Sequence, residues 1–96
     1  MTKEYIINLI KTDKEILSNR FGVEKIGLFG SYVKGTATEE SDIDFYVVFK
    51  KKTLDNMTGL WLYLEKLFGK KVDLMHEHPR LRRGLKEQIE QEIEYA

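Results

Sequence analysis

Residues 42–49 form the stretch that most constrains how this chain can fold. Their sequence, DIDFYVVF, is rich in Ile, Phe, Tyr and Val, which predicts a strand. The strand begins with two carboxylates, Asp42 and Asp44. Because residues two apart on a strand point to the same face, these carboxylates are expected to repel each other, and burying them unpaired would be expensive. Taken alone, the pair is more simply a polar strand entry or a helix cap.

Strand-like and helix-like runs alternate along the rest of the chain. Short apolar runs predict further strands at residues 25–29 and 71–75. Apolar residues at helical spacing predict helices over residues 3–21, 54–68 and 81–93, the last of them after Pro79. This alternation predicts an α/β fold, in which helices pack on one small sheet.

Two shorter segments have less regular patterns. Thr12 and Glu15 have the spacing of a capping box, so the first helical segment is expected as one helix or as two short ones joined near residues 11–13. Residues 31–38 have helix-start chemistry but include a glycine and two threonines, which predicts a single turn or a short helix.

Length and composition narrow the class of protein. The 96 residues, 42% of them hydrophobic and 33% charged, predict a single globular domain over 1–96. No apolar run approaches the roughly 20 residues of a membrane helix, and the N-terminus lacks a signal-peptide pattern. The chain has no cysteine, which permits a reducing cytoplasm, so a cytoplasmic protein is expected. The formal net charge of zero argues against a non-specific nucleic-acid binder.

Asp73 extends the acidic pair to three carboxylates. It lies between Val72 and Leu74 in a predicted strand, and it completes a site with Asp42 and Asp44 if the two strands are neighbours. Oxygen ligands without Cys or His favour Mg²⁺ or Mn²⁺ over zinc. Three such acids could hold two ions about 3.5–4 Å apart, the arrangement used for in-line displacement at phosphorus. In that arrangement the third carboxylate is also a candidate general base.

The pair Gly30-Ser31 supplies groups that suit a phosphate. Glycine lets backbone N–H groups approach a phosphate closely, and the turn that follows directs further donors to the same place. Ser31 adds a hydroxyl, and Lys34 could extend from the turn toward phosphates. The other basic and acidic runs are more simply solvated faces than contacts of a triphosphate or of an acidic partner.

Other motifs fail on particular residues. The glycines of this stretch have the spacing of a P-loop, but Thr36 stands where the lysine must be. The run after Asp42 lacks the further acid and the glycine of an EF-hand. His76 and His78 share a face in an extended segment, but two ligands without a third make a poor zinc site, so a loop is expected there.

Residues 30–49 resemble the GSx10DxD signature of the minimal nucleotidyltransferases, within the DNA polymerase beta-like superfamily. Gly30-Ser31, ten residues, Asp42, one residue and Asp44 match its spacing in full, and Asp73 in KVDLM resembles the third carboxylate. The resemblance covers nearly the whole chain and implies a nucleotidyltransferase fold, a small mixed sheet of three or more strands with helices packed on it.

The resemblance also implies an activity and a partner. Members of this family bind ATP with Mg²⁺ and transfer a nucleoside monophosphate. Many are antitoxins of an all-helical HEPN ribonuclease toxin, and adenylylation (AMPylation) of a toxin tyrosine is the reaction implied. Carried onto this chain, the resemblance assigns phosphates to Gly30 and Ser31, both metals to Asp42 and Asp44, and the nucleophile-side metal to Asp73. The family often has arginine at the position of Lys34, which keeps the charge but not the bidentate geometry.

Two other functions are compatible with the same residues. One is a catalytically silent module that neutralises its partner by contact, with the charged runs at 80–83 and 87–94 as its interface. The other is transfer of a nucleotide to a small molecule such as an aminoglycoside. It ranks last because larger drug-modifying relatives append a helical domain that these residues lack.

Overall fold

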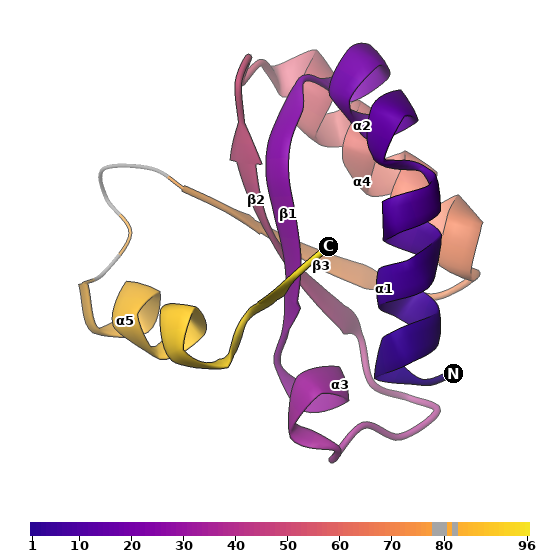
Figure 1. The fold of residues 1–96 in the computed structure, drawn as a ribbon, viewed down its shortest axis with the longest axis vertical. Coiled ribbons are helices and arrows are strands. Elements are labelled where there is room, and N and C mark those ends of the chain that lie inside the picture. The colour runs from indigo at the N-terminus through magenta and orange to yellow at the C-terminus, as the bar shows by residue number, and fades with distance from the viewer. Residues whose placement is uncertain (78–80, 82) are drawn as a thin grey trace.

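The computed structural model describes residues 1–77, 81 and 83–96, so the predictions for His78, Pro79, Arg80 and Arg82 lie outside it. Figure 1 follows the chain through its elements. They are α1 (Lys3–Thr12), α2 (Lys14–Phe21), β1 (Val23–Phe29), α3 (Ser31–Lys34), β2 (Ile43–Phe49), α4 (Leu54–Phe68), β3 (Val72–His76), α5 (Arg83–Glu92) and β4 (Glu94–Tyr95).

The strands form one mixed sheet in the order β3-β2-β1-β4. β1 pairs antiparallel with β2 and with β4, whereas β2 and β3 are parallel. Parallel neighbours need a crossover connection, and α4 supplies it between β2 and β3. The predicted α/β fold with a small mixed sheet is therefore confirmed. β4 was not predicted, because two residues are too short for a periodic signal, and Ile93 follows the last helix rather than belonging to it.

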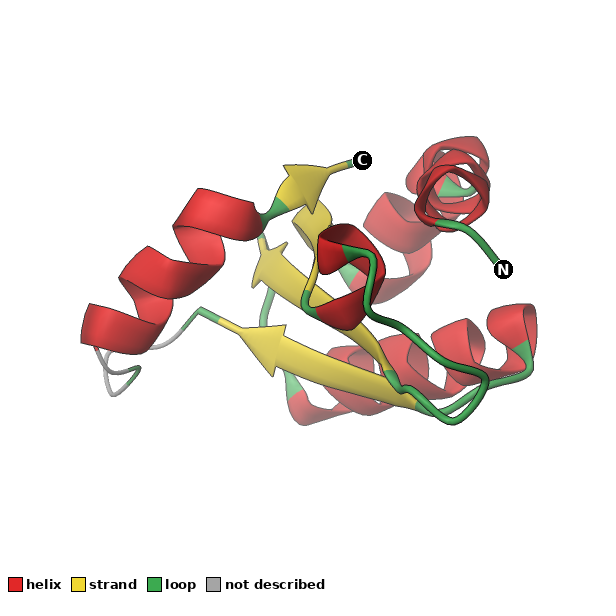
Figure 2. Ribbon diagram, turned by 90° about the horizontal axis from the view of Figure 1, so that it is seen from below, coloured by secondary structure: helices red, strands yellow, loops and turns green. Residues whose placement is uncertain are grey.

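Helices cover the two faces of the sheet unequally. α1, α2 and α4 lie on one side of the sheet and α5 lies on the other (Figures 1 and 2). Alternate residues of β2 are fully buried in the main core: Ile43, Phe45 and Val47. The helices on that side contribute further buried side chains to the same cluster: Ile6, Ile10, Leu17, Leu60 and Leu64. Burial of this apolar surface is the main term that holds the helices on the sheet.

The helix ends explain where the elements begin and stop. Thr2 caps α1 by accepting a hydrogen bond from the Tyr5 backbone N–H at 3.1 Å, and Thr53 caps α4 in the same way. The predicted joint within residues 3–21 is present at Asp13, but the capping box is wrong. Thr12 ends α1, and its hydroxyl donates back to the Asn8 carbonyl at 2.9 Å.

The topology brings three chain segments together at one end of the strands. β1 ends at Phe29, which is paired with Asp44 near the start of antiparallel β2. β3 is parallel to β2 and starts beside it, with Asp44 opposite Asp73. The glycine turn, the first residues of β2 and the first residues of β3 thus meet in one place. Among the helices of the described residues, none is long and apolar enough to cross a membrane.

Candidate active site

Two of the three predicted carboxylates lie on neighbouring strands. Asp44 and Asp73 are register partners across the parallel β2–β3 pair, so both side chains leave the same face of the sheet. Because Ile43 and Phe45 point into the main core, Asp44 points to the opposite face, the one that α5 partly covers. Asp42 precedes β2 and is exposed, as is Asp73, whereas Asp44 is half-buried.

The Gly30 turn is built around the Asp44 carboxylate. Gly30 has φ 79° and ψ −149°, a combination that residues with a side chain essentially never adopt. A Cβ at this position would collide with Oδ2 of Asp44. The Ser31 backbone N–H donates a hydrogen bond to the Asp44 carboxylate. Gly30 does allow a close approach, but in this structure the approaching group is a carboxylate of the chain itself, and the phosphate contact stays a prediction.

The surroundings of Asp44 oppose its negative charge. Burial and then, in decreasing order, the neighbouring carboxylates of Asp73, Asp42 and Glu92 together raise the pKa of Asp44 from 3.8 to about 6. The hydrogen bond from the Ser31 backbone N–H acts in the opposite direction. The carboxylates predicted to share a site therefore interact electrostatically, and a cation near them would relieve the repulsion.

These residues suit a divalent cation in chemistry, although they do not form a finished coordination shell. The donors are all carboxylate oxygens, and their mutual repulsion favours a hard cation such as Mg²⁺. Within the described residues, however, no three His, Cys, Asp or Glu side chains are arranged to hold one ion together. The metal roles of Asp42, Asp44 and Asp73 remain predictions.

The predicted phosphate-binding groups contact a residue that the sequence did not single out. The Gly30 backbone N–H donates to Glu92 Oε1 at 3.1 Å, and Lys34 Nζ lies 3.4 Å from Glu92 Oε2. Glu92 is the last residue of α5 and lies 62 positions from Gly30 in the chain. In the sequence it is one acid among several in the run 87–94, so no local signal distinguishes it. Only the pairing of β4 with β1 brings it here.

The basic run at residues 50–52 and His76 lie away from this site. Lys50 to Lys52 follow the end of β2, about 20 Å along the strand from Asp44 at a rise of about 3.3 Å per residue. Lys50 donates instead to the Ser18 hydroxyl at 2.6 Å. The loop expected at His76 is wrong for this residue, which is the last of β3, and its predicted partner His78 is outside the described residues.

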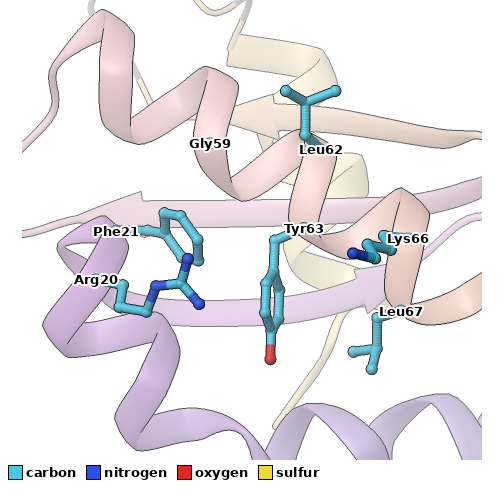
Figure 3. A pocket seen from close by; sticks show the side chains of 7 residues that line it. All are labelled: Arg20, Phe21, Gly59, Leu62, Tyr63, Lys66 and Leu67. Atoms are coloured by element: carbon cyan, nitrogen blue, oxygen red, sulfur yellow. The ribbon is translucent and has the colours of Figure 1, made fainter.

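A hollow between α2 and α4 is separate from the carboxylates. Figure 3 shows the residues that line it: Arg20, Phe21, Gly59, Leu62, Tyr63, Lys66 and Leu67. The Arg20 guanidinium lies 5.1 Å from the centre of the Phe21 ring and 5.7 Å from that of Tyr63. Phe21 lies just before β1, whereas Gly30 lies just after it. The hollow is therefore at the opposite end of β1 from the Asp44 carboxylate. Its lining includes no carboxylate, which excludes it as the predicted metal site.

Sequence comparison finds similar proteins over nearly the whole chain. The family model described as polymerase beta, nucleotidyltransferase, matches residues 11–94. The protein adenylyltransferase MntA of Thermococcus cleftensis is 40% identical over 97 residues, which cover 100% of this chain and 97% of that protein.

Solved structures with the same fold agree with these matches. One, provisionally described as a minimal nucleotidyltransferase, has a TM-score of 0.73 and 33% identity, covering 92% of this chain and 93% of that one. Another is the complex of a tri-AMPylated HEPN toxin of Shewanella oneidensis with its MNT antitoxin. Its TM-score is 0.62 at 21% identity, covering 92% of this chain and 69% of that one, and at this identity the likeness concerns the fold alone.

Proposed function

Because this chain belongs to the polymerase beta nucleotidyltransferase family, we propose that it transfers AMP from ATP to a tyrosine hydroxyl of a HEPN-type toxin, as the antitoxin of that toxin. The observation that carries the proposal is the position of Asp44, opposite Asp73 and against the Gly30-Ser31 turn. In this position the carboxylates lie beside the groups that we propose to bind the phosphates. The MntA relative, similar over its whole length, is named for the same transfer to protein.

The proposed roles follow from these positions. Asp42 and Asp44 would hold Mg²⁺, and Asp73 would hold the ion on the side of the acceptor hydroxyl. Bound Mg²⁺ supplies charge neutralisation at the phosphates and lowers the pKa of the attacking hydroxyl. The Gly30 N–H, the Ser31 hydroxyl and Lys34 would orient the triphosphate.

In the proposed reaction the tyrosine oxygen bonds to the α-phosphorus as the bond to the bridging oxygen breaks. Pyrophosphate leaves, and Asp73, whose side chain is exposed, would take the tyrosine proton. The acceptor is proposed to come from a second protein, because Asp42 and Asp73 are exposed where the two strands begin. A single domain over 1–96 is part of the same proposal.

Labelled ATP tests the transfer directly. The chain would be incubated with a HEPN-type toxin of the same organism, Mg²⁺ and ATP labelled at the α-phosphate. We expect label on the toxin with the wild type and with Asp55→Asn, which removes an exposed acid of α4 away from the site. Asp42→Ala/Asp44→Ala should abolish labelling. If the double variant labels the toxin as well as the wild type does, the proposed roles are wrong.

A second candidate, the silent binding module, is favoured by one observation. The described residues lack a ready three-ligand group, and Glu92 occupies the phosphate donors. In that case the wild type transfers no label, and the Asp42→Ala/Asp44→Ala variant still binds the toxin and suppresses its toxicity. Labelling by the wild type, together with loss of suppression in the variant, would exclude this candidate.

A further inference from the structure

Both oxygens of the Glu92 carboxylate lie on groups that a phosphate would use. Oε1 accepts from the Gly30 backbone N–H at 3.1 Å, and Oε2 lies 3.4 Å from Lys34 Nζ. The Glu92 side chain is only 18% exposed, whereas that of Lys34 is 50% exposed. A backbone N–H and an ammonium group are donors that phosphate oxygens also use. The two Glu92 oxygens therefore lie as two oxygens of one phosphate would.

The backbone on the C-terminal side of Glu92 is fixed on β1, so its position beside Gly30 is built into the fold. Glu94 pairs with Leu28 in β1, and the Ala96 N–H donates to the Ile26 carbonyl at 3.0 Å. Between them and Glu92, the Ile93 side chain fills the space above Gly27, where a Cβ would come within 2.6 Å of it. These contacts hold the segment whether or not Glu92 is charged.

The ion pair itself is a weak reason for a glutamate here. Lys34 is half exposed, and ion pairs at such positions contribute little to stability. The same carboxylate adds repulsion to a site that already contains Asp42, Asp44 and Asp73, and it contributes to the raised pKa of Asp44. A glutamine would keep an acceptor for the Gly30 N–H without that repulsion. The charge of Glu92 therefore opposes anions at the phosphate donors more than it holds α5 in place.

We propose that Glu92 occupies the phosphate-binding donors of the free protein and makes the site select metal-bound triphosphates over metal-free nucleotides and other anions. This inference rests on the proposed function, because it assigns Gly30 and Lys34 to the triphosphate. A metal-free triphosphate must displace Glu92 and lie beside three further carboxylates. A triphosphate that arrives with divalent cations offsets that repulsion, and the glutamate side chain can then rotate away from the donors.

Nucleotide binding to Glu92→Gln, measured by calorimetry, tests the selection. The probe is α,β-methylene-ATP, whose α–β bridge cannot be cleaved, titrated at about pH 8 in EDTA and in excess Mg²⁺. The control is Glu90→Gln, an equal charge change at an exposed residue of the same helix. We expect Glu92→Gln to lower the Kd in EDTA by about tenfold, the gain expected when a charge-assisted hydrogen bond no longer competes, and by much less in Mg²⁺. Glu90→Gln should match the wild type.

Three results would count against the inference. An unchanged or higher Kd for Glu92→Gln, with wild-type binding intact, overturns it and leaves the proposed function standing. An equal gain in Glu90→Gln also overturns it, because the effect would then be one of net charge. If neither the wild type nor the variants bind the probe in Mg²⁺, the nucleotide site fails and the proposed function falls with the inference.

The Gly30 amide provides a second measurement, which begins with the wild type. Its ¹H–¹⁵N signal in the wild type should shift when the probe is added with Mg²⁺, since the N–H exchanges Glu92 for a phosphate oxygen. In Glu92→Gln the starting shift should differ and the change on binding should be smaller. A Gly30 signal that is the same before and after saturation of the wild type would contradict the displacement of Glu92.

Discussion

Replacing Gly30 by alanine tests whether the glycine turn and the Asp44 carboxylate are one unit. Gly30 has φ 79° and ψ −149°, and a residue with a side chain pays about 1–3 kcal/mol for such a conformation. The added Cβ would also push Asp44 off the Ser31 backbone N–H. Loss of a hydrogen bond to a charged group costs about 1.5–3 kcal/mol, partly recovered if the carboxylate rotates into solvent. Together these terms predict a loss of about 3–4 kcal/mol in the free energy of unfolding.

Gly35→Ala is the matched control for this variant. Gly35 also has φ 79°, but its ψ of 18° is left-handed helical, and a Cβ there would meet no atom of the described residues within 4 Å beyond its own chain neighbours. A cost of about 1–2 kcal/mol is expected there. Urea denaturation of both variants measures the difference, because a domain of this size is stable by about 5–15 kcal/mol and both should still fold.

A third variant separates backbone strain from the collision. In an Asp44→Ala background the carboxylate that Gly30→Ala would strike is gone, so the cost of Gly30→Ala should fall by about 1–2 kcal/mol. If Gly30→Ala costs no more than Gly35→Ala, or if its cost is the same with and without the carboxylate, the contact with Asp44 is not what requires glycine.

Three further predictions follow from named contacts. Burial and neighbouring carboxylates raise the pKa of Asp44 from 3.8 to about 6, so its ionisation costs stability that grows from about pH 4 and is complete above about pH 6. Asp44→Asn should therefore add about 1 kcal/mol to the free energy of unfolding near pH 8 after solvent screening but nothing below about pH 4, as denaturation across that range would reveal. Tyr63→Phe removes the hydrogen bond from its hydroxyl to Asp13 Oδ2, 2.6 Å long, and should cost about 1 kcal/mol in urea denaturation; a neutral result would mean that solvent replaces the bond. Gly27→Ala should cost about 1–3 kcal/mol by the same method because its Cβ meets Ile93, and truncating that residue to alanine should relieve the collision; additive costs would contradict this.

The glycine turn and the carboxylates at the beginning of β2 could be predicted because their sequence signals are local. The run after Asp42 is apolar and β-branched, and the turn at Gly30 is a glycine followed by a helix start, so strand, turn and carboxylates could each be placed from a few neighbouring residues. That Asp73 would lie beside Asp44 depended on two strands being neighbours, and the parallel β2–β3 pair fulfils that condition. The register of the pair, with the two aspartates directly opposite, could not be known from either strand alone.

Glu92 could not be found in this way because its position depends on contacts distant in sequence. It reaches Gly30 only because Ile93 packs above Gly27 and Glu94 pairs with Leu28. Neither contact has a periodic pattern, since β4 consists of two residues at the end of an acidic run. The same holds for Gly27. Ile93 packs where a side chain at this position would lie, but in the sequence the glycine only interrupts an apolar strand.

The charges of the site imply that metal and nucleotide bind interdependently. The carboxylates of Asp73 and Asp42 repel that of Asp44 and raise its pKa, while Lys34 is engaged by Glu92. Cations reduce the repulsion among the aspartates, and phosphates need Lys34. Under the proposed function, each ligand therefore makes binding of the other more favourable. Linkage requires the two effects to be equal: the factor by which saturating Mg²⁺ tightens the nucleotide is the factor by which the nucleotide tightens Mg²⁺. We expect a factor of about 10 or more, and it should shrink in Glu92→Gln, where nucleotide no longer needs the cation to displace a carboxylate. A factor near one in the wild type would mean that the carboxylates and the phosphate donors act as separate sites.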